Sequence, residues 1–246
     1  MNLVVDIGNT RAKAAVFVGD QIQKAWVVEK STLEQSLLAL RNQFPQIERA
    51  LVSSVAEDAR HLIGKSLKGI SVMELSATTP LNFDSRYDDL TRLGADRKAL
   101  VAAAVTKFSG KTVLVIDMGS CVTYDLVDAN KMHHGGGISA GWSMRLKAMH
   151  EQTSRLPLLN STEVVGVHDG SVMGTTTEAA MHRATFNGLV DEIDGAINRY
   201  RQEYPDLTVI LTGGDAAVFS VRLKNGIFAH SNFLLEGLNA LLQHNT

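Results

Sequence analysis

The first 30 residues show a pattern of hydrophobic and polar positions that predicts β-strands. The apolar runs "LVVD", "AKAAVFV" and "QIQKAWVV" predict three short strands within residues 2–28, with a Gly-Asp turn between the second and the third. Asp6, Gly8, Asn9 and Thr10 stand between the first two runs. A tight hairpin usually needs only Asn-Gly or Asp-Gly. This junction therefore carries more polar chemistry than a turn requires.

After residue 30 the apolar period becomes that of a helix. Ser31 and Glu34 have the spacing of a capping box, and the leucines that follow form one apolar face. "RALVSSV" predicts a buried strand, residues 56–67 a helix and "ISVMEL" another strand. The polar stretch 78–92 has no period and predicts a long loop, and long loops in compact domains are more often functional than idle. A helix rich in alanine and valine is predicted over 94–108.

The order of strand, aspartate, small loop and strand starts again at residue 111, in "KTVLVIDMGSCVTYDLV". Aligning the two copies lays Asp117 on Asp6, Gly119 on Gly8, Ser120 on Asn9 and Cys121 on Thr10. A repeat that keeps its polar residues predicts a duplicated α/β fold, with an N-terminal half over 1–110 and a C-terminal half over 111–246.

The rest of the second copy alternates helices and strands. We interpret His133, His134 and the glycines after them as turn residues. Helices are predicted over about 141–152 and 176–201, where Thr175 and Glu178 have capping-box spacing. The strand "LTVILT", a Gly-Gly pair and further helices complete the chain.

Composition limits the class of protein. The 246 residues are 45% hydrophobic and 20% charged, which is ordinary for a globular protein. The formal net charge of −2 argues against nucleic acid as a partner, and the single cysteine favours a reducing compartment. The N-terminus has no basic leader and its apolar run is too short to span a membrane. We therefore expect a cytoplasmic protein with neither nucleic-acid nor membrane partners.

The two loops of the form Asp-x-Gly-small-small are suited to phosphate. Glycine lets the backbone approach an anion, and successive amides form an anion-binding nest. The aspartates, Asp6 and Asp117, can hold a cation that neutralises phosphate charge, and Lys13 can contact a phosphate oxygen. The segment Thr212-Gly213-Gly214 follows a strand, where a ring or ribose can lie against the backbone. Together these features predict nucleoside triphosphate binding without the GxxxxGK[ST] loop.

Several of these residues also have purely structural interpretations. Asp6 and Asp117 can cap strand ends, although the repeated pair makes this less favoured than for either alone. Asp96 can be the N-cap of the helix that follows it, where aspartate is common, and the pattern alone favours that interpretation. Trp142 fits either the core or an interface.

The motifs "DIGNTRAK", "LGADR", "DMGSCVT", "GGGISAGWSMRL", "GTTTEAA" and "LTGGDA" stand in an order and at a spacing that resembles the type III pantothenate kinases. These belong to the actin-like superfamily of acetate and sugar kinases. The similarity runs from residue 3 to about 216. It implies duplicated ribonuclease H-like (actin-like ATPase) domains with a cleft between them. The implied activity is ATP-dependent phosphorylation of pantothenate to 4′-phosphopantothenate, the first step toward coenzyme A.

The resemblance also implies cofactors, an assembly state and residue roles. ATP would act with Mg²⁺ or another divalent cation that Asp6 would bind, Asp117 would hold K⁺ or NH₄⁺, and the protein would be a homodimer. The nucleotide would contact Asp6, Gly8, Asn9, Thr10 and Lys13 in the first loop, Ser120 in the second, and Thr212, Gly213 and Gly214 near adenosine. Pantothenate would contact Tyr87, Gly94, Ala95, Asp96, Arg97 and Thr177, with Asp96 accepting the proton of its primary hydroxyl.

Four residues depart from the family pattern. Ser120-Cys121 stands where Thr-Ala is usual, Leu90 where proline is common, and Ala140 where the GGxIxPG pattern has proline. Ser120 keeps a hydroxyl, so none of these changes removes a group that the chemistry needs. Two other functions remain open from the sequence: a kinase of the same scaffold acting on a sugar or a short carboxylic acid, and a non-catalytic nucleotide-binding regulator.

Overall fold

The computed structural model describes residues 1–8, 11–54, 63, 66–161 and 171–246. Asn9, Thr10 and most of the helix predicted over 56–67 lie outside the described residues. The chain groups into two compact units, and each is described by itself. Unit 1 comprises Met1–Gly110, Val127–Gly135 and Asn232–Thr246, and unit 2 comprises Lys111–Leu126 and Gly136–Ser231. The predicted halves over 1–110 and 111–246 describe a repeat along the chain and stay a prediction.

Unit 1 contains a mixed sheet that begins with the predicted triplet of strands. Its strands are β1 (Asn2–Ile7), β2 (Arg11–Val18), β3 (Gln21–Glu29), β4 (Arg49–Ser54) and β5 (Ser71–Glu74), in the order β3-β2-β1-β4-β5. The triplet is antiparallel, whereas β4 pairs in parallel with both β1 and β5. A central strand that is covered on both faces reads as continuously apolar, which explains the run of Leu3, Val4 and Val5 in β1.

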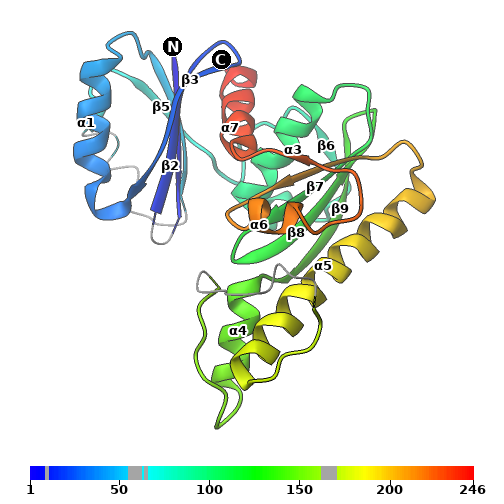
Figure 1. Ribbon diagram of the computed structural model, residues 1–246. Coiled ribbons are helices and arrows are strands. Elements are labelled where there is room, and N and C mark those ends of the chain that lie inside the picture. Colours follow the sequence, from blue (N-terminus) through cyan, green and yellow to red (C-terminus); the bar gives the residue numbers. More distant parts are fainter. Residues whose placement is uncertain (9–10, 55–62, 64–65, 162–170) are drawn as a thin grey trace. The chain divides into compact units, whose positions relative to one another are not determined.

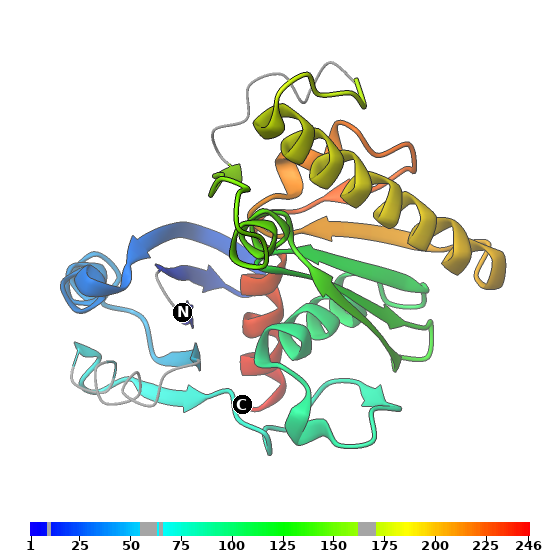
Figure 2. The ribbon, with the colours of Figure 1, turned by 90° about the horizontal axis from the view of Figure 1, so that it is seen from below.

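Helices α1 (Leu33–Gln43) and α7 (Phe233–His244) lie on opposite faces of this sheet (Figures 1 and 2). Leu33, Leu37 and Leu40 of α1 pack against one face. Helix α3 (Ala95–Lys107) packs along α7. A Cβ atom on Gly237 would come 1.8 Å from the carbonyl oxygen of Ala99, so only glycine permits this approach. The packing fixes α3, whose first residues carry the predicted acceptor motif.

Unit 2 is built around a second mixed sheet. Its strands are β7 (Val113–Met118), β8 (Cys121–Val127), β9 (Met132–Ala140), β10 (Thr208–Thr212) and β11 (Phe228–Ala229), and the strand order is β11-β10-β7-β8-β9-β6. The short strand β6 (Asp84–Ser85) pairs with the first residues of β9. Both β6 and these first residues of β9 group with unit 1. Taking β7 with β1, the order β9-β8-β7-β10-β11 matches that of the first sheet.

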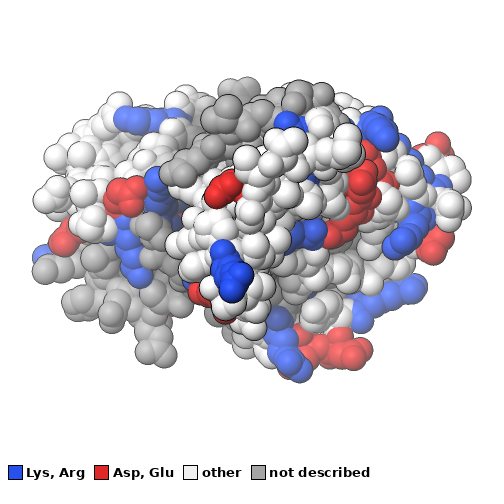
Figure 3. Space-filling model, turned by 60° about the horizontal axis from the view of Figure 1, so that its bottom comes forward, with Lys and Arg blue, Asp and Glu red and all other residues white. Residues whose placement is uncertain are grey.

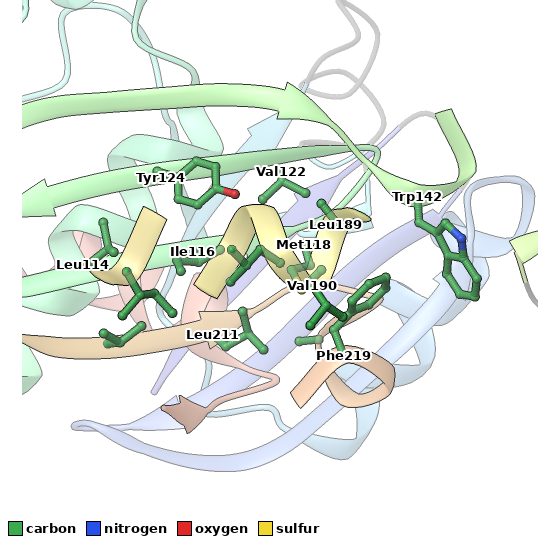
Figure 4. Packing of buried hydrophobic residues seen from close by; sticks show 14 of the residues in the cluster. Leu114, Ile116, Met118, Val122, Tyr124, Trp142, Leu189, Val190, Leu211 and Phe219 are labelled. Carbon is green, nitrogen blue, oxygen red and sulfur yellow. The ribbon is translucent and has the colours of Figure 1, made fainter. Parts of the chain in front are cut away.

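The core of unit 2 lies between this sheet and the helices α4 (Trp142–Glu151), α5 (Thr177–Glu203) and α6 (Ala216–Ser220) (Figure 4). Phe186, Leu189, Ile193 and Ile197 recur at helical spacing along α5 and are buried. Trp142 is only 2% exposed and contacts the rings of Phe186 and Phe219 edge-on. Trp142 is therefore a core residue of its own unit.

Three local predictions were wrong. Helix α1 begins after the one-turn helix η1 (Lys30–Thr32), so its N-cap is Thr32 and not the predicted Ser31. The Thr32 side chain makes no capping hydrogen bond. Helix α5 is capped by Thr176, whose Oγ1 accepts the amide of Ala179 at 3.2 Å, one residue after the predicted Thr175. His133 and His134 belong to strand β9 and are not turn residues, and His133 pairs with Ser85 of β6.

In the described part of the chain no helix combines the length and the apolar character needed to cross a membrane. On the face drawn in Figure 3, acidic and basic side chains of the described residues are interspersed. This mixture agrees with the net charge of −2. The cytoplasmic location and the absence of a nucleic-acid partner stay predictions.

Candidate active site

Asp6 lies near the end of β1, at the centre of the first sheet. Its register partners are Lys13 on β2 and Ser53 on β4. Burial raises the pKa of Asp6 above its ordinary value of 3.8; the Ser53 hydroxyl, hydrogen-bonded to the carboxylate, and the charge of Lys13 lower it, and the negative charge of Asp96 raises it. The ionised form of Asp6 is therefore less favourable here than in water, and a perturbed carboxylate at the start of the first polar loop is typical of a functional position.

The first polar loop is closed by its glycine. The amide of Gly8 donates to the carbonyl oxygen of Arg11 at 3.0 Å. A Cβ atom at position 8 would lie 3.2 Å from that same oxygen, so a side chain would crowd the turn. Asn9 and Thr10, which complete the predicted phosphate loop, lie outside the described residues.

The second polar loop closes in the same way but is one residue shorter. The amide of Gly119 donates to the carbonyl oxygen of Cys121 at 3.0 Å. Cys121 is the first residue of β8, as Arg11 is the first residue of β2. The gapless alignment of Cys121 with Thr10 was therefore wrong, because the backbone hydrogen bond and the start of the strand make Cys121 the counterpart of Arg11. Ser120 is exposed beside the turn.

The Thr-Gly-Gly segment lies against the end of β7. Thr212 pairs with Asp117 in the register of β10 and β7, and the amide of Asp215 donates to the carbonyl oxygen of Met118 at 3.1 Å. Gly213 has φ +101°, and a Cβ atom there would come 2.5 Å from Oδ1 of Asp117. Unit 2 thus brings together Asp117 and the predicted adenosine segment, with the second polar loop beginning at Gly119.

The predicted acceptor motif forms the start of α3. Gly94 is the N-cap, so Asp96 is the second residue of the helix and the interpretation of Asp96 as the N-cap was wrong. Oδ1 of Asp96 accepts the amide of Arg97 at 2.8 Å, and the residue is exposed. A Cβ atom on Gly94 would lie 2.4 Å from that oxygen, so glycine leaves room for the carboxylate.

Arg97 is buried and its guanidinium is held by Tyr87. Nη1 of Arg97 donates to the Tyr87 hydroxyl at 3.3 Å, and Cζ lies 5.4 Å from the centre of the ring, within cation–π range. The Tyr87 ring stacks on His133 at a centroid distance of 6.2 Å. Nδ1 of His133 is hydrogen-bonded to the Ser85 hydroxyl at 2.9 Å. These contacts fix a cation beside Asp96.

The predicted site residues divide between the units. Unit 1 gathers one set: Asp6, Gly8, Lys13, Tyr87, Gly94, Ala95, Asp96 and Arg97. Unit 2 holds a second set: Asp117, Ser120, Thr177, Thr212, Gly213 and Gly214. Thr177 is the exposed first residue of α5 and is not brought to the loop of Ser120 by any described contact. In the described residues no group of three or more His, Cys, Asp or Glu side chains forms a metal cage.

Sequence reasoning missed the residues that support the site. Ser53, Ser85 and His133 act on Asp6 and Tyr87 through pairings between distant strands. Lys98 was also missed: it is buried, its Nζ donates to the carbonyl of Ser76 at 3.4 Å, and burial lowers its pKa. The one available signal was the Ser-Ser pair that ends the apolar run of β4.

Two mixed sheets of like strand order, with a glycine-closed loop after β1 and after β7, define an α/β fold that solved structures of sugar kinases share. A Campylobacter jejuni protein assigned to the Baf family of transcriptional activators has this fold, with a TM-score of 0.62 at 22% identity over 99% of this chain and 98% of its own. A glucokinase from an Antarctic psychrotroph has a TM-score of 0.53 at 12% identity, over 99% of this chain and 98% of its own.

The sequence profile described as type III pantothenate kinase matches residues 2–199. A type III pantothenate kinase of Christiangramia forsetii is 40% identical over 245 residues, 100% of this chain and 99% of its own. A type III pantothenate kinase of Bacteroides fragilis is 40% identical over 249 residues, which cover 100% of this chain and 98% of its own. The chain belongs to the type III pantothenate kinase family, whose activity is the ATP-dependent phosphorylation of pantothenate.

Proposed function

We propose that this chain transfers the γ-phosphoryl group of ATP to the primary hydroxyl of pantothenate, with Asp96 as the proton acceptor. The observation that carries the proposal is that the negative charge of Asp96, at the start of helix α3, acts on Asp6, near the end of β1. Arg97, the next residue of α3, is hydrogen-bonded to Tyr87. Asp96 and the glycine-closed turn at Gly8 belong to one compact unit, which supports a role of Asp96 as an acceptor-side carboxylate near the first phosphate loop.

Phosphoryl transfer mainly requires positioning and stabilisation of charge. The pantothenate hydroxyl oxygen forms a bond to the γ-phosphorus, the bond to the β,γ-bridging oxygen breaks, and ADP leaves. The hydroxyl proton goes to Asp96 as the new P–O bond forms. A carboxylate is a weak base for a free alcohol, so its earlier task is to orient the hydroxyl.

The nucleotide is proposed to contact both phosphate loops and the Thr-Gly-Gly segment. Gly8, Asn9, Thr10 and Lys13 would hold phosphate from the first loop, and Ser120 from the second; Thr212, Gly213 and Gly214 would lie near adenosine. This assignment treats the two sheets as ribonuclease H-like halves, an interpretation that their common strand order supports. The cleft between the halves stays a prediction.

Two cations are part of the proposal. Asp6 is the residue that would hold a divalent cation with ATP, since Mg²⁺ binds proteins through one or two carboxylates together with substrate phosphates. Burial, and to a smaller extent the charge of Asp96, raise the pKa of Asp6, and a bound cation would stabilise its ionised form. Asp117 would hold K⁺ or NH₄⁺, and the cation would neutralise phosphate charge.

Pantothenate is proposed to bind along Gly94-Ala95-Asp96-Arg97, with Tyr87 and Thr177 as further contacts. Arg97 offers a guanidinium that the Tyr87 ring holds in place, and a guanidinium suits the carboxylate of pantothenate. The homodimer is a further proposal. Trp142 cannot support it because it is a core residue, whereas Met144 is 41% exposed. Light scattering that returned 26.7 kDa for an active sample would refute the dimer.

A substrate panel tests the function directly. ADP release is measured with pantothenate, common sugars, acetate and no acceptor. We expect ADP to be released with pantothenate and with none of the other acceptors. Release with a sugar or acetate would favour another kinase on this scaffold. ATP binding without release under any condition would favour the regulator.

A further inference from the structure

Arg145 of α4 makes two hydrogen bonds to the segment that precedes its helix. Its Nε donates to the carbonyl oxygen of Ala140 at 2.8 Å, and its Nη2 donates to the Ser139 hydroxyl at 3.1 Å. Nη2 also pairs with the carboxylate of Glu192 on α5. All these residues belong to unit 2. Tying α4 to α5 would need only the bond to Glu192, so the two other bonds point to a second role.

Glu192 is itself fixed. Its Oε1 accepts the Tyr124 hydroxyl at 3.0 Å, while Oε2 pairs with Arg145. Burial alone raises the pKa of Glu192, but the hydrogen bonds from Arg145, Ser139 and Tyr124 and the charge of Arg145 hold it below its ordinary value. The carboxylate is therefore ionised at neutral pH, and the guanidinium is held in one orientation by a charge-assisted bond.

The segment that Arg145 holds lies directly on the second polar loop. The amide of Gly141 donates to the carbonyl oxygen of Ser120 at 3.1 Å. A Cβ atom on Gly141 would come 2.4 Å from the carbonyl oxygen of Gly119 and 2.6 Å from that of Ser120. Backbone touches backbone here, so a displacement of Ser139–Gly141 moves the loop that carries Ser120.

We propose that Arg145, oriented by Glu192, is a positioning residue for the second phosphate loop. It holds the carbonyl of Ala140 and the hydroxyl of Ser139, which places Gly141 against Ser120, and Ser120 then meets the nucleotide. The inference rests on the proposed nucleotide role of Ser120. It identifies two residues outside the nucleotide motifs, far apart in sequence, on which affinity for ATP depends.

The test measures ATP binding to the full chain directly, by titration calorimetry at a temperature well below the melting temperature. Arg145→Met should weaken ATP affinity about tenfold, the effect of removing about 1.4 kcal/mol, and should leave the Michaelis constant for pantothenate within about twofold. Lys147→Met is the matched control: it removes a cation from the same helix, where Lys147 makes an exposed pair with Glu151 at 3.6 Å. ATP affinity of the control should not change.

Glu192→Gln should weaken ATP affinity in the same direction, and combining it with Arg145→Met should add little, because both changes release the same segment. A role limited to packing would lower the melting temperature without this shared loss of affinity. If Arg145→Met does not fold, Glu192→Gln decides. Unchanged ATP affinity in the folded variant overturns the inference.

Ser120→Ala separates this inference from the proposed function. If Ser120→Ala weakens ATP binding and Arg145→Met does not, the positioning role is wrong and the nucleotide site stands. If neither change affects ATP binding, both the assignment of Ser120 and the inference built on it are wrong.

Discussion

Asp6 lies within electrostatic reach of Asp96, a residue of a different element that is far apart in the sequence: burial raises the pKa of Asp6, and the negative charge of Asp96 raises it further. Asp6 is the last but one residue of a central strand, and Asp96 occupies the second position of helix α3. Like charges that approach one another are unfavourable unless a cation or a proton separates them. The fold thus keeps two carboxylates at a place where a metal-bound phosphate would relieve their repulsion.

Asp6→Asn should raise the melting temperature of the ligand-free protein at pH 7 while abolishing turnover. The folded pKa of Asp6 is raised above 3.8, so the folded state gains less from ionisation than the unfolded state does. Wild type therefore loses stability relative to the variant as pH rises from 3.8 through the folded pKa, and the two should converge below that window. Each kcal/mol gained in the free energy of unfolding raises the melting temperature by about 2–4 °C in a chain of this size.

Calorimetric melting of both proteins between pH 3.5 and 8 checks this. Asp84→Asn, an exposed aspartate on β6, is the control and should show no comparable rise. A variant less stable than wild type at every pH would contradict the argument from burial.

The sequence predicted the strands around both polar loops because apolar runs ending in aspartate and glycine are local signals. It also placed Asp96 at the start of a helix, but it could not tell the N-cap from the second position, which backbone geometry decides. The roles of Ser53 and His133 could not be predicted, since they depend on which distant strands pair. The one-residue difference between the loops escaped a gapless alignment for the same reason: hydrogen bonding, rather than spacing, sets the equivalence of Cys121 and Arg11.

Tyr87→Phe should raise the Michaelis constant for pantothenate about tenfold and leave that for ATP unchanged. The change removes the hydroxyl that accepts from Arg97, a hydrogen bond to a charged group worth about 1.5 kcal/mol or more. It keeps the ring and its cation–π contact. Tyr87→Leu, which removes both, should have the larger effect. Initial-rate kinetics check the order; Tyr204→Phe in unit 2 is the control, and equal effects of all three variants would contradict the role.

Potassium or ammonium should be required for full activity, and sodium should not replace them. Asp117 is a carboxylate at the end of β7, beside the second polar loop and in contact with the Thr-Gly-Gly segment. Asp117→Asn should reduce turnover and remove most of the dependence on the cation. The measurement compares rates in sodium and potassium buffers from which ammonium has been excluded. Equal wild-type rates in the two buffers would count against the site.

Asp96→Asn should reduce turnover about 10²–10⁴-fold, the usual contribution of a general base. Asparagine can still accept the amide of Arg97 through Oδ1, so helix α3 should keep its start. The lost charge at the helix N-terminus costs at most about 1 kcal/mol. ADP release, ATP affinity and melting temperature are measured together, with Asp88→Asn, an exposed neighbour, as control. Turnover within about threefold of wild type would leave Asp96 with a structural role only.

Gly213→Ala should abolish measurable ATP binding, whereas Gly214→Ala should be tolerated. A Cβ atom at position 213 would lie 2.5 Å from Oδ1 of Asp117 and from the backbone of Met118, and φ is +101°, where L-residues are strained. At position 214 a Cβ atom would meet nothing within 4 Å. The two changes add the same methyl group to neighbouring residues, so overall hydrophobicity and helix propensity cannot explain a difference. ATP affinity and melting temperature of both variants decide. Because the clash falls on Asp117, Gly213→Ala should also lose its response to potassium, and a variant that bound ATP with wild-type affinity would refute the close packing of this segment on Asp117.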